Sequence, residues 1–385
     1  MKTILIVNQQ QFGYLSDAYN YCLHLREKFS IIYICWDYGQ KKIAMDGVNV
    51  IYIPRQHPIK WLRLAAYIRA VLNELRSQDY SIVFVIYFRG CSLLRLFSPA
   101  FRTMVMDIRT GSVRKGNLLR ALENILLRFE CMFYQNITII SESLMKMLGI
   151  GARKCRIFPV GGPDPHLPEK QFQELKLLYV GTLKNRDIHK TVEGLSQLYK
   201  ESENLPPLRY DIVGDGTDDD MVRLKSAIEQ SPCRDAIRFH GRIPHSELRP
   251  YFEQANVGVA FVPMTDYFQC QPVTKVFEYL LAGMPVVATR TYENMRVITQ
   301  SNGVLVTDTA QGFHDGLKDL VEHFHRFDSR EIKNTGIPFS WQNIVLNIVF
   351  PHFESLCHER TRIQIDKTGA TPSASKLGLP TSTKL

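Results

Sequence analysis

Residues 271–289 (QPVTKVFEYLLAGMPVVAT) combine a helical pattern with side chains that suit anion binding. Thr274, Lys275 and Glu278 share one face of the predicted helix, the first two near its start. The free N–H groups and the dipole of a helix N-terminus attract anions, so a hydroxyl and an ammonium there could hold a diphosphate. Glu278, one turn further on, could accept hydrogen bonds from two hydroxyls of a sugar ring. The alternative is an ordinary amphipathic helix whose polar face is solvated.

The elements that would position these side chains are a short helix, a glycine stop and a buried strand. Pro272 suits the first helical position, and Gly283 suits the left-handed residue after the last turn. One apolar stripe at i, i+4, i+7 and i+8 consists of Val273, Phe277, Leu280 and Leu281. We therefore expect an amphipathic helix followed directly by a strand.

A second pair of polar side chains comes at the end of an apolar run, residues 103–107. Asp107 ends this run, and Arg109 follows two residues later in a loop that contains Gly111. Ligands of doubly wound sheets bind where strands end, so Asp107 could act there and Arg109 could hold a phosphate. The alternative is an aspartate that caps the loop, with a structural arginine partner.

The first half of the sequence predicts a doubly wound parallel sheet. Residues 3–7 (TILIV) form an apolar, β-branched run, and a polar loop containing Gly13 follows them. Further strands are predicted at 31–35, 48–53, 82–87, 103–107 and 137–140, with helical segments at 58–77, 91–97 and 116–134. This alternation is typical of an α/β domain. The loop has no GxGxxG, so Gly13 marks either a ligand site or a simple turn.

A second series of strands begins after a Pro/Gly-rich break at residues 159–165. Its strands are predicted at 177–180, 210–213, 237–240, 257–261 and 286–289. The first three end in glycine loops, whose permissive backbone could read a nucleotide base, with Arg242 and Ile243 as candidates. Ser340 and Trp341 begin a last helix that ends near Cys357.

The chain organisation that follows has two domains, because 385 residues exceed what one core usually organises. We predict an N-terminal Rossmann-like domain (1–160), a C-terminal domain (165–335) and a C-terminal helix (336–358). A tail (363–385) rich in Thr, Ser, Gly, Pro and Lys should be disordered.

Charge and cysteine usage restrict the environment. Residues 1–160 contain 22 Lys+Arg and 10 Asp+Glu, although the whole chain carries only +9. This basic half suggests an anionic partner such as a membrane surface, unless it only keeps the protein soluble. The eight cysteines are scattered without metal-site spacing, which favours reduced thiols in the cytoplasm.

Two helical segments, residues 59–69 and 114–133, mix bulky apolar residues with cations. Either could lie on an anionic membrane interface with its cations reaching outward. Either could instead be a core-packed helix with a basic outer face. No uncharged apolar run is long enough for a spanning helix.

The ordered chain resembles glycosyltransferases of the GT-B fold, in the retaining group called family 4 or glycosyl transferases group 1. The resemblance is carried by YVGTL (179–183) with Arg186, IVGDG (212–216), FHGRIP (239–244), KVFEYL (275–280) and AGMPVV (282–287). It implies two Rossmann-like doubly wound domains facing a cleft, with the acceptor bound by the N-terminal domain and the nucleotide-sugar donor by the C-terminal one. It also implies a last helix that crosses back to the N-terminal domain.

Site residues are carried over by position. Gly181, Thr182 and Gly214 resemble donor-loop residues, and Arg186 and Lys275 resemble cations at the diphosphate. Glu278 matches the second acid of the E-x7-E motif. The first acid would stand at position 270, where this chain has Cys270, so the motif is a variant.

The acceptor-side assignments concern three residues: Asp107 resembles an acceptor-side catalytic position, and Gly13 and Arg109 are placed beside it. The acidic run 218–220 opens a surface helix and is interpreted as capping, so we expect no metal and no cofactor.

The resulting functional hypothesis is a retaining, metal-independent glycosyltransferase that acts on a glycan or a lipid-linked acceptor in cell-surface polysaccharide or glycoconjugate synthesis. We expect it in the cytoplasm, peripheral at the inner face of the membrane, with no nucleic-acid partner. The alternatives are an epimerase-like enzyme that acts on sugar nucleotides with the same fold, and a noncatalytic partner subunit, which the missing acid at 270 suggests.

Overall fold

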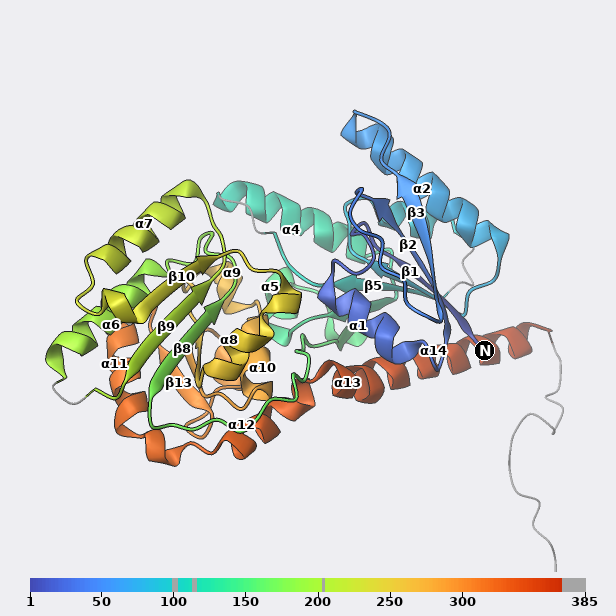
Figure 1. Ribbon diagram of the computed structural model, residues 1–385. Coiled ribbons are helices and arrows are strands. Elements are labelled where there is room, and N and C mark those ends of the chain that lie inside the picture. The colour runs from blue at the N-terminus through green and yellow to red at the C-terminus, as the bar shows by residue number, and fades with distance from the viewer. Residues whose placement is uncertain (99–102, 113–115, 203–204, 369–385) are drawn as a thin grey trace, which may run out of the picture. The chain divides into compact units, whose positions relative to one another are not determined.

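The computed structural model describes residues 1–98, 103–112, 116–202 and 205–368. Its strands form two parallel sheets with helices between most successive strands (Figure 1). The predicted α/β class with two doubly wound sheets is therefore confirmed. Within the described residues, no helix is long and apolar enough to cross a membrane.

The first sheet has seven strands in the order β3-β2-β1-β4-β5-β6-β7. They are β1 (Thr3–Val7), β2 (Ser30–Asp37), β3 (Val48–Pro54), β4 (Ile82–Ile86), β5 (Met104–Ile108), β6 (Asn136–Ile139) and β7 (Cys155–Ile157). The helices among them are α1 (Ser16–Leu25), α2 (Lys60–Ser77), α3 (Ser92–Leu96), α4 (Asn117–Cys131) and α5 (Glu142–Leu148). Both neighbours of β1 pair with it in parallel, and the strand order reverses between β1 and β4.

The second sheet has six strands in the order β10-β9-β8-β11-β12-β13. They are β8 (Leu175–Val180), β9 (Leu208–Val213), β10 (Ile237–Gly241), β11 (Val257–Ala260), β12 (Val286–Thr289) and β13 (Gly303–Val306). The helices are α6 (His189–Glu201), α7 (Asp218–Glu229), α8 (Arg249–Gln254), α9 (Asp266–Gln269), α10 (Thr274–Leu281), α11 (Ala310–Glu322) and α12 (Ser329–Gly336). In Figure 1, α6 and α11 lie on one side of this sheet and α8 and α10 on the other.

The strands of the second sheet are apolar on both faces because helices cover both faces. β11 and β12 are buried at every residue, and β8 is buried at every residue except Lys176. The strand order reverses between β8 and β11, which pair in parallel. This reversal defines a topological switch point, where open α/β sheets bind ligands.

The last helix begins where the sequence predicts and continues further. Ser340 caps α13 (Trp341–Ile344) by accepting from the Asn343 N–H, a π-helical segment (Val345–Val349) follows, and α14 spans Phe350–Thr368. The predicted end near Cys357 and the disordered start of the tail at 363 are therefore wrong. Arg360 explains the longer helix, because its buried guanidinium donates to the Asp79 carboxylate at 2.6–2.7 Å. Residues 369–385 of the predicted tail lie outside the described residues.

The chain divides into two compact units that differ from the predicted domains. One contains residues 1–106, 133–135 and 346 onward, and the other contains residues 107–132 and 136–345. In the first unit the α14 rings of Phe350 and Phe353 contact Phe29 and Phe84, at centroid distances of 5.8 and 5.3 Å. Helix α14 thus packs against Phe29 and strand β4 in the first unit.

Candidate functional site

A cavity of about 260 Å³ lies at the carboxyl ends of β8 and β11. Residues 179–182, 186, 259–262, 267–268 and 271–275 line it. These strands are the two that flank the switch point of the second sheet. The cavity brings together five residues that the sequence predicts for the donor, namely Gly181, Thr182, Arg186, Thr274 and Lys275.

The glycine loops at the ends of β8 and β9 lie in direct contact. The Gly181 N–H donates to the Val213 carbonyl at 3.0 Å, and the Gly214 N–H donates to the Gly241 carbonyl at 2.8 Å. A Cβ on Gly214 would stand 1.8 Å from the Gly181 carbonyl oxygen, so no larger residue fits there without displacing the loop. Gly214 therefore acts on the site through Gly181 and does not line the cavity itself.

Thr182 is held by the neighbouring loop. Its hydroxyl donates to the Asp215 carbonyl at 3.2 Å, and its own carbonyl accepts from the Tyr179 hydroxyl at 2.6 Å. The Leu183 N–H also donates to the Asp215 carbonyl. The β8 loop is thus fixed along its length, which orients its backbone at the cavity wall.

Arg186 supplies a permanent positive charge. Its guanidinium lies 4.2 Å from the ring centroid of Phe268, within range of a cation–π interaction. Burial lowers the pKa of the Arg186 guanidinium from its ordinary value, and the nearby Tyr179 and Tyr267 oppose that shift. An arginine remains charged at neutral pH even so. The stacked ring limits where the guanidinium can point.

The helix α10 begins at Thr274, with Val273 as its N-cap residue. The prediction that Pro272 takes the first helical position is therefore wrong by two residues, because Val273 keeps an extended backbone. Thr274 and Lys275 remain in the first turn, where N–H groups lack partners within the helix. The Lys275 ammonium donates to a Glu278 carboxylate oxygen at 2.7 Å.

The close approach of α10 to the sheet depends on a glycine and a tyrosine. The Val180 N–H donates to the Tyr279 hydroxyl at 3.0 Å. A Cβ on Gly258 in β11 would stand 2.3 Å from the Tyr279 ring, so only glycine admits that ring. The helix is buried at every position from Val276 to Leu281, Glu278 included, which speaks against the alternative of an ordinary amphipathic helix with a solvated polar face. Strands β11 and β12 of the sheet contact α10, and helix α12 also packs against it.

Glu278 is buried and does not line the cavity. Its carboxylate pairs with Lys275, and a Cβ on Gly162 would stand 3.2 Å from its side chain. In this geometry Glu278 positions the ammonium at the cavity, and its predicted contact with the donor stays a prediction.

Cys270 occupies the position of the first acid of the motif. Its carbonyl accepts a hydrogen bond from the Ser141 hydroxyl at 2.9 Å. Burial raises the pKa of the Cys270 thiol above its ordinary value, so the thiol is neutral at pH 7. The backbone of Cys270 therefore makes this contact, and its thiol is not the acid that the motif would place here.

Arg242 and Ile243 are not among the described residues that line the cavity. Arg242 is 82% exposed and lies 3.6 Å from the Asp215 carboxylate. Ile243 packs against the core of the second sheet. Their predicted role in reading the base is not supported by a position in this cavity.

Asp107 and Arg109 lie at the end of β5. The Asp107 carboxylate is fully buried and accepts from the Thr138 hydroxyl at 2.6 Å. Arg109 lies 3.8 Å from that carboxylate and donates to the Phe158 carbonyl at 2.9 Å. This burial favours the structural alternative for Asp107, whose catalytic role stays a prediction.

Gly13 lies in the loop after β1 with φ at +90°, where a side chain is strained. A Cβ on it would also stand 2.3 Å from the Ile43 side chain. These two facts explain the glycine as a turn residue, the alternative that the sequence left open.

The aromatic wall of the cavity was not predicted. Phe261 ends the β11 run, and Tyr267 and Phe268 come from α9. Thr265 caps α9 by accepting from the Phe268 N–H. A threonine three residues before Phe268 is the sequence signal from which the start of α9 could have been predicted. Such a four-residue helix has no periodicity from which its ring positions could be inferred.

The acidic run 218–220 caps α7 as predicted. Thr217 and Asp220 form a reciprocal capping box, and Arg223 pairs with Asp220 at 2.8 Å. Across the part of the chain that the structure describes, no group of three His, Cys, Asp or Glu side chains is arranged to hold a metal ion.

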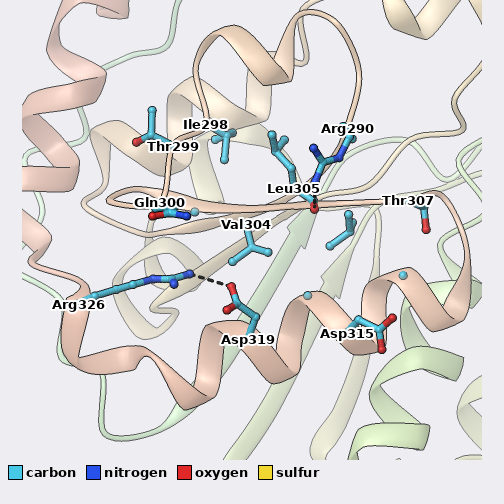
Figure 2. Close-up of a pocket in the computed structure, with 14 residues that line it drawn as sticks. Arg290, Ile298, Thr299, Gln300, Val304, Leu305, Thr307, Asp315, Asp319 and Arg326 are labelled. Carbon is cyan, nitrogen blue, oxygen red and sulfur yellow. Dashed lines mark hydrogen bonds and ion pairs between the residues drawn. The ribbon is translucent and has the colours of Figure 1, made fainter.

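A second cavity, of about 580 Å³, lies along the edge strand β13 (Figure 2). Figure 2 shows Arg326 pointing toward Asp319, and the two side chains pair at 2.9 Å. This cavity is larger, but it contains none of the predicted site residues and lies at the end of the strand order. The cavity at β8 and β11 is therefore the candidate donor site.

Residues 174–323, which contain every residue that lines this donor cavity, match the family model described as glycosyl transferases group 1. Over these residues the chain is similar to group 1 glycosyltransferases. No curated protein matches the chain.

Several solved structures share the fold of the whole chain. Anabaena Alr3699/HepE, in complex with UDP and glucose, aligns at 12% identity over 96% of this chain and 100% of its own, with a TM-score of 0.68. The lipopolysaccharide outer core galactosyltransferase WaaB aligns at 14% identity over 91% and 100%, with a TM-score of 0.65. Sucrose-phosphate synthase from Thermosynechococcus elongatus aligns at 15% identity over 96% and 100%, with a TM-score of 0.62. These structures confirm the predicted GT-B fold, and the family model supports the resemblance to glycosyltransferases over residues 174–323.

Proposed function

We propose that this protein transfers a sugar from a nucleoside-diphosphate sugar to a glycan or lipid-linked acceptor, with retention at the anomeric carbon. The observation that carries the proposal is the cavity at the switch point, where Arg186 and Lys275 meet the N-terminus of α10. A diphosphate is the dianionic group that two cations and a helix N-terminus suit. Alr3699/HepE is similar in fold and is described in complex with UDP-glucose, so UDP-sugars are the first donors to test.

The chemistry at this site is stabilisation of a leaving group. The bond between the anomeric carbon and the diphosphate oxygen breaks as the acceptor oxygen bonds to that carbon. The acceptor proton passes to a phosphate oxygen on the same face. Negative charge grows on the diphosphate, and fixed cations and helix dipoles stabilise it without reorganising. We therefore propose that transfer needs no metal ion.

Retention is proposed because of the composition of the cavity wall. Among the described residues that line the cavity, none is Asp or Glu. A double displacement would need a carboxylate nucleophile, and glycosidases use a facing pair. Front-face transfer needs neither group.

The proposed setting is the cytoplasmic face of a membrane, in the synthesis of cell-surface polysaccharide or glycoconjugate. The basic first half of the chain supports an anionic surface as partner. We propose no nucleic-acid partner.

Proton NMR of the product anomer tests the mechanism. Incubation with UDP-glucose and an acceptor should give a product with the anomeric configuration of the donor, and chelation of divalent ions should leave the rate unchanged. An inverted product would contradict front-face transfer, and a rate that falls with EDTA and returns with Mg²⁺ would contradict metal independence.

Incubation with donor alone separates the alternatives. An epimerase-like enzyme changes the sugar nucleotide without an acceptor. A noncatalytic partner subunit gives no product with any donor until its catalytic partner is added. The proposed transferase forms a new glycosidic bond only when the acceptor is present.

A further inference from the structure

Helix α4 (Figure 1, teal) carries a row of exposed apolar side chains. Six bulky apolar side chains on it are 51–74% exposed. They are Leu118, Leu119, Leu122, Ile125, Phe129 and Met132, and we call them the α4 face. Single exposed apolar residues are ordinary, but a contiguous row on one helix marks an interaction surface.

The inward face of α4 carries polar side chains as well as the buried Leu127 and Cys131. The Asn124 side-chain oxygen accepts from the Ser112 N–H at 2.9 Å, and the Glu123 carboxylate accepts from the Ser112 hydroxyl. Glu130 is 2% exposed. A surface helix normally turns its widest apolar stripe inward, whereas the widest apolar face of α4 is exposed. Its polar groups are already satisfied by the protein, and its apolar face needs an apolar environment from outside.

The width of the α4 face indicates what covers it. With 3.6 residues per turn, the arc from Ala121 to Leu119 spans about 160° of the helix surface. A coiled-coil seam uses only two positions in seven, which is a narrower stripe. The half-buried Leu126 lies inside the arc, and Arg128 lies just beyond Ala121. A broad apolar arc suits a helix that lies in a lipid interface.

The charges around the helix favour an anionic lipid. Arg128 is exposed at one border of the α4 face, and a Cβ on Gly149 would stand 3.2 Å from its guanidinium. Arg153 and Lys154, which follow Gly149 closely, are also exposed. Residues 1–160 have twelve more cations than acidic residues. Exposed cations beside an apolar face bind phospholipid headgroups while the apolar side chains enter the acyl boundary.

We propose that the α4 face inserts into the surface of an anionic phospholipid bilayer. This inference rests on the proposed function, because insertion would hold the enzyme at the membrane where a lipid-linked acceptor is found. Of the two interpretations that the sequence leaves open for residues 114–133, it selects the membrane one. Residue 114 itself lies outside the described residues.

Vesicle sedimentation of the full chain tests the proposal. The wild type should bind vesicles of phosphatidylcholine with phosphatidylglycerol, and the double variant Ile125→Glu/Phe129→Glu should bind at least 10-fold more weakly. The matched control is Tyr199→Glu/Val222→Glu, which puts the same charges at exposed apolar positions of α6 and α7 and should bind like the wild type. A wild type that binds no vesicle, or a double variant that binds as well as the control, would overturn the proposal.

Two further measurements keep the outcomes distinct. Brominated phosphatidylglycerol in vesicles should quench the fluorescence of the tryptophan in the Phe129→Trp variant. Unquenched fluorescence at this position would overturn the proposal even if the Glu variant unfolds. A wild type that forms dimers in solution, dispersed by Ile125→Glu/Phe129→Glu, without vesicle binding would show that a second copy covers the face. Thermal shift with UDP is measured in parallel, since vesicle binding without nucleotide binding would retain the docking surface and remove the proposed donor.

Discussion

The two sheets reverse their strand order at equivalent places, β1/β4 and β8/β11, but the loops there differ in chemistry. After β1, Gln11 closes the loop with neutral hydrogen bonds, donating to the Gln40 carbonyl and accepting from the Tyr38 N–H, both at 2.8 Å. Asn8 donates to the Tyr33 hydroxyl at 2.6 Å. After β8, the loop instead borders an open cavity with Arg186 in its wall.

This difference shows what topology decides and what it leaves to the residues. The switch point fixes where a parallel sheet can bind a ligand. The side chains decide which ligand, because amides that satisfy their own loop offer no charge, whereas Arg186 and Lys275 attract an anion. We therefore propose the cationic switch point at β8/β11 as the donor site.

Removal of a cation should give the largest effect. Lys275→Ala should lower the transfer rate by about 10²- to 10³-fold, because a fixed charge at the leaving diphosphate is lost. Glu278→Ala should also abolish transfer, since it frees the ammonium that Glu278 holds at 2.7 Å. Steady-state rates and circular dichroism measure transfer and folding.

The matched control for these variants is Lys225→Ala, which removes an exposed lysine from α7. It should transfer at the wild-type rate. Full activity in both site variants would remove Lys275 and Glu278 from the site.

A side chain added at the contact between the two glycine loops should have an intermediate effect on nucleotide binding. Gly214→Ala would place a Cβ 1.8 Å from the Gly181 carbonyl, so the β8 loop must shift. We expect a loss of about 2 kcal/mol in the free energy of unfolding and about 10-fold weaker nucleotide binding. Calorimetry measures both, and Gly151→Ala, where a Cβ meets nothing within 4 Å, should match the wild type. Unchanged nucleotide affinity in Gly214→Ala would show that the loop contact does not shape the cavity.

The neutral loop after β1 should give the smallest effect on the donor. Gln11→Ala leaves the buried loop contacts to Gln40 and Tyr38 unmade, which should cost about 1–3 kcal/mol of stability. Nucleotide affinity should stay within 2-fold of the wild type. A large loss of affinity, with stability unchanged, would contradict the division of roles between the two loops.

The sequence predicts the strands well because buried parallel strands are continuous apolar runs. Residues 3–7 and 286–289 are strands at the predicted bounds. Strand β13 and helix α5 were not predicted from the sequence, and both are short segments. The helical period placed α4 correctly, but a period cannot tell which face is buried. The orientation of α4 depends on contacts such as that of Ser112, whose N–H donates to the Asn124 side chain.

The candidate site was predictable where its residues belong to recurring motifs. Gly181, Arg186 and Lys275 meet in one cavity as the resemblance implies. The burial of Asp107 and the exposure of Arg242 were not predictable from the sequence. Asp107 is buried against residues distant in sequence, such as Thr138, whereas the Arg242 side chain extends into solvent.

Nucleotide binding by the wild type and by Lys275→Ala tests the central claim most directly. UDP at 100 times its Kd should raise the free energy of unfolding of the wild type by about 2.7 kcal/mol, measured by thermal shift across UDP, GDP and ADP. In Lys275→Ala the same concentration of the same nucleotide should stabilise far less. Equal stabilisation of both proteins, or none of the wild type by any nucleotide, would contradict a donor site at the ends of β8 and β11.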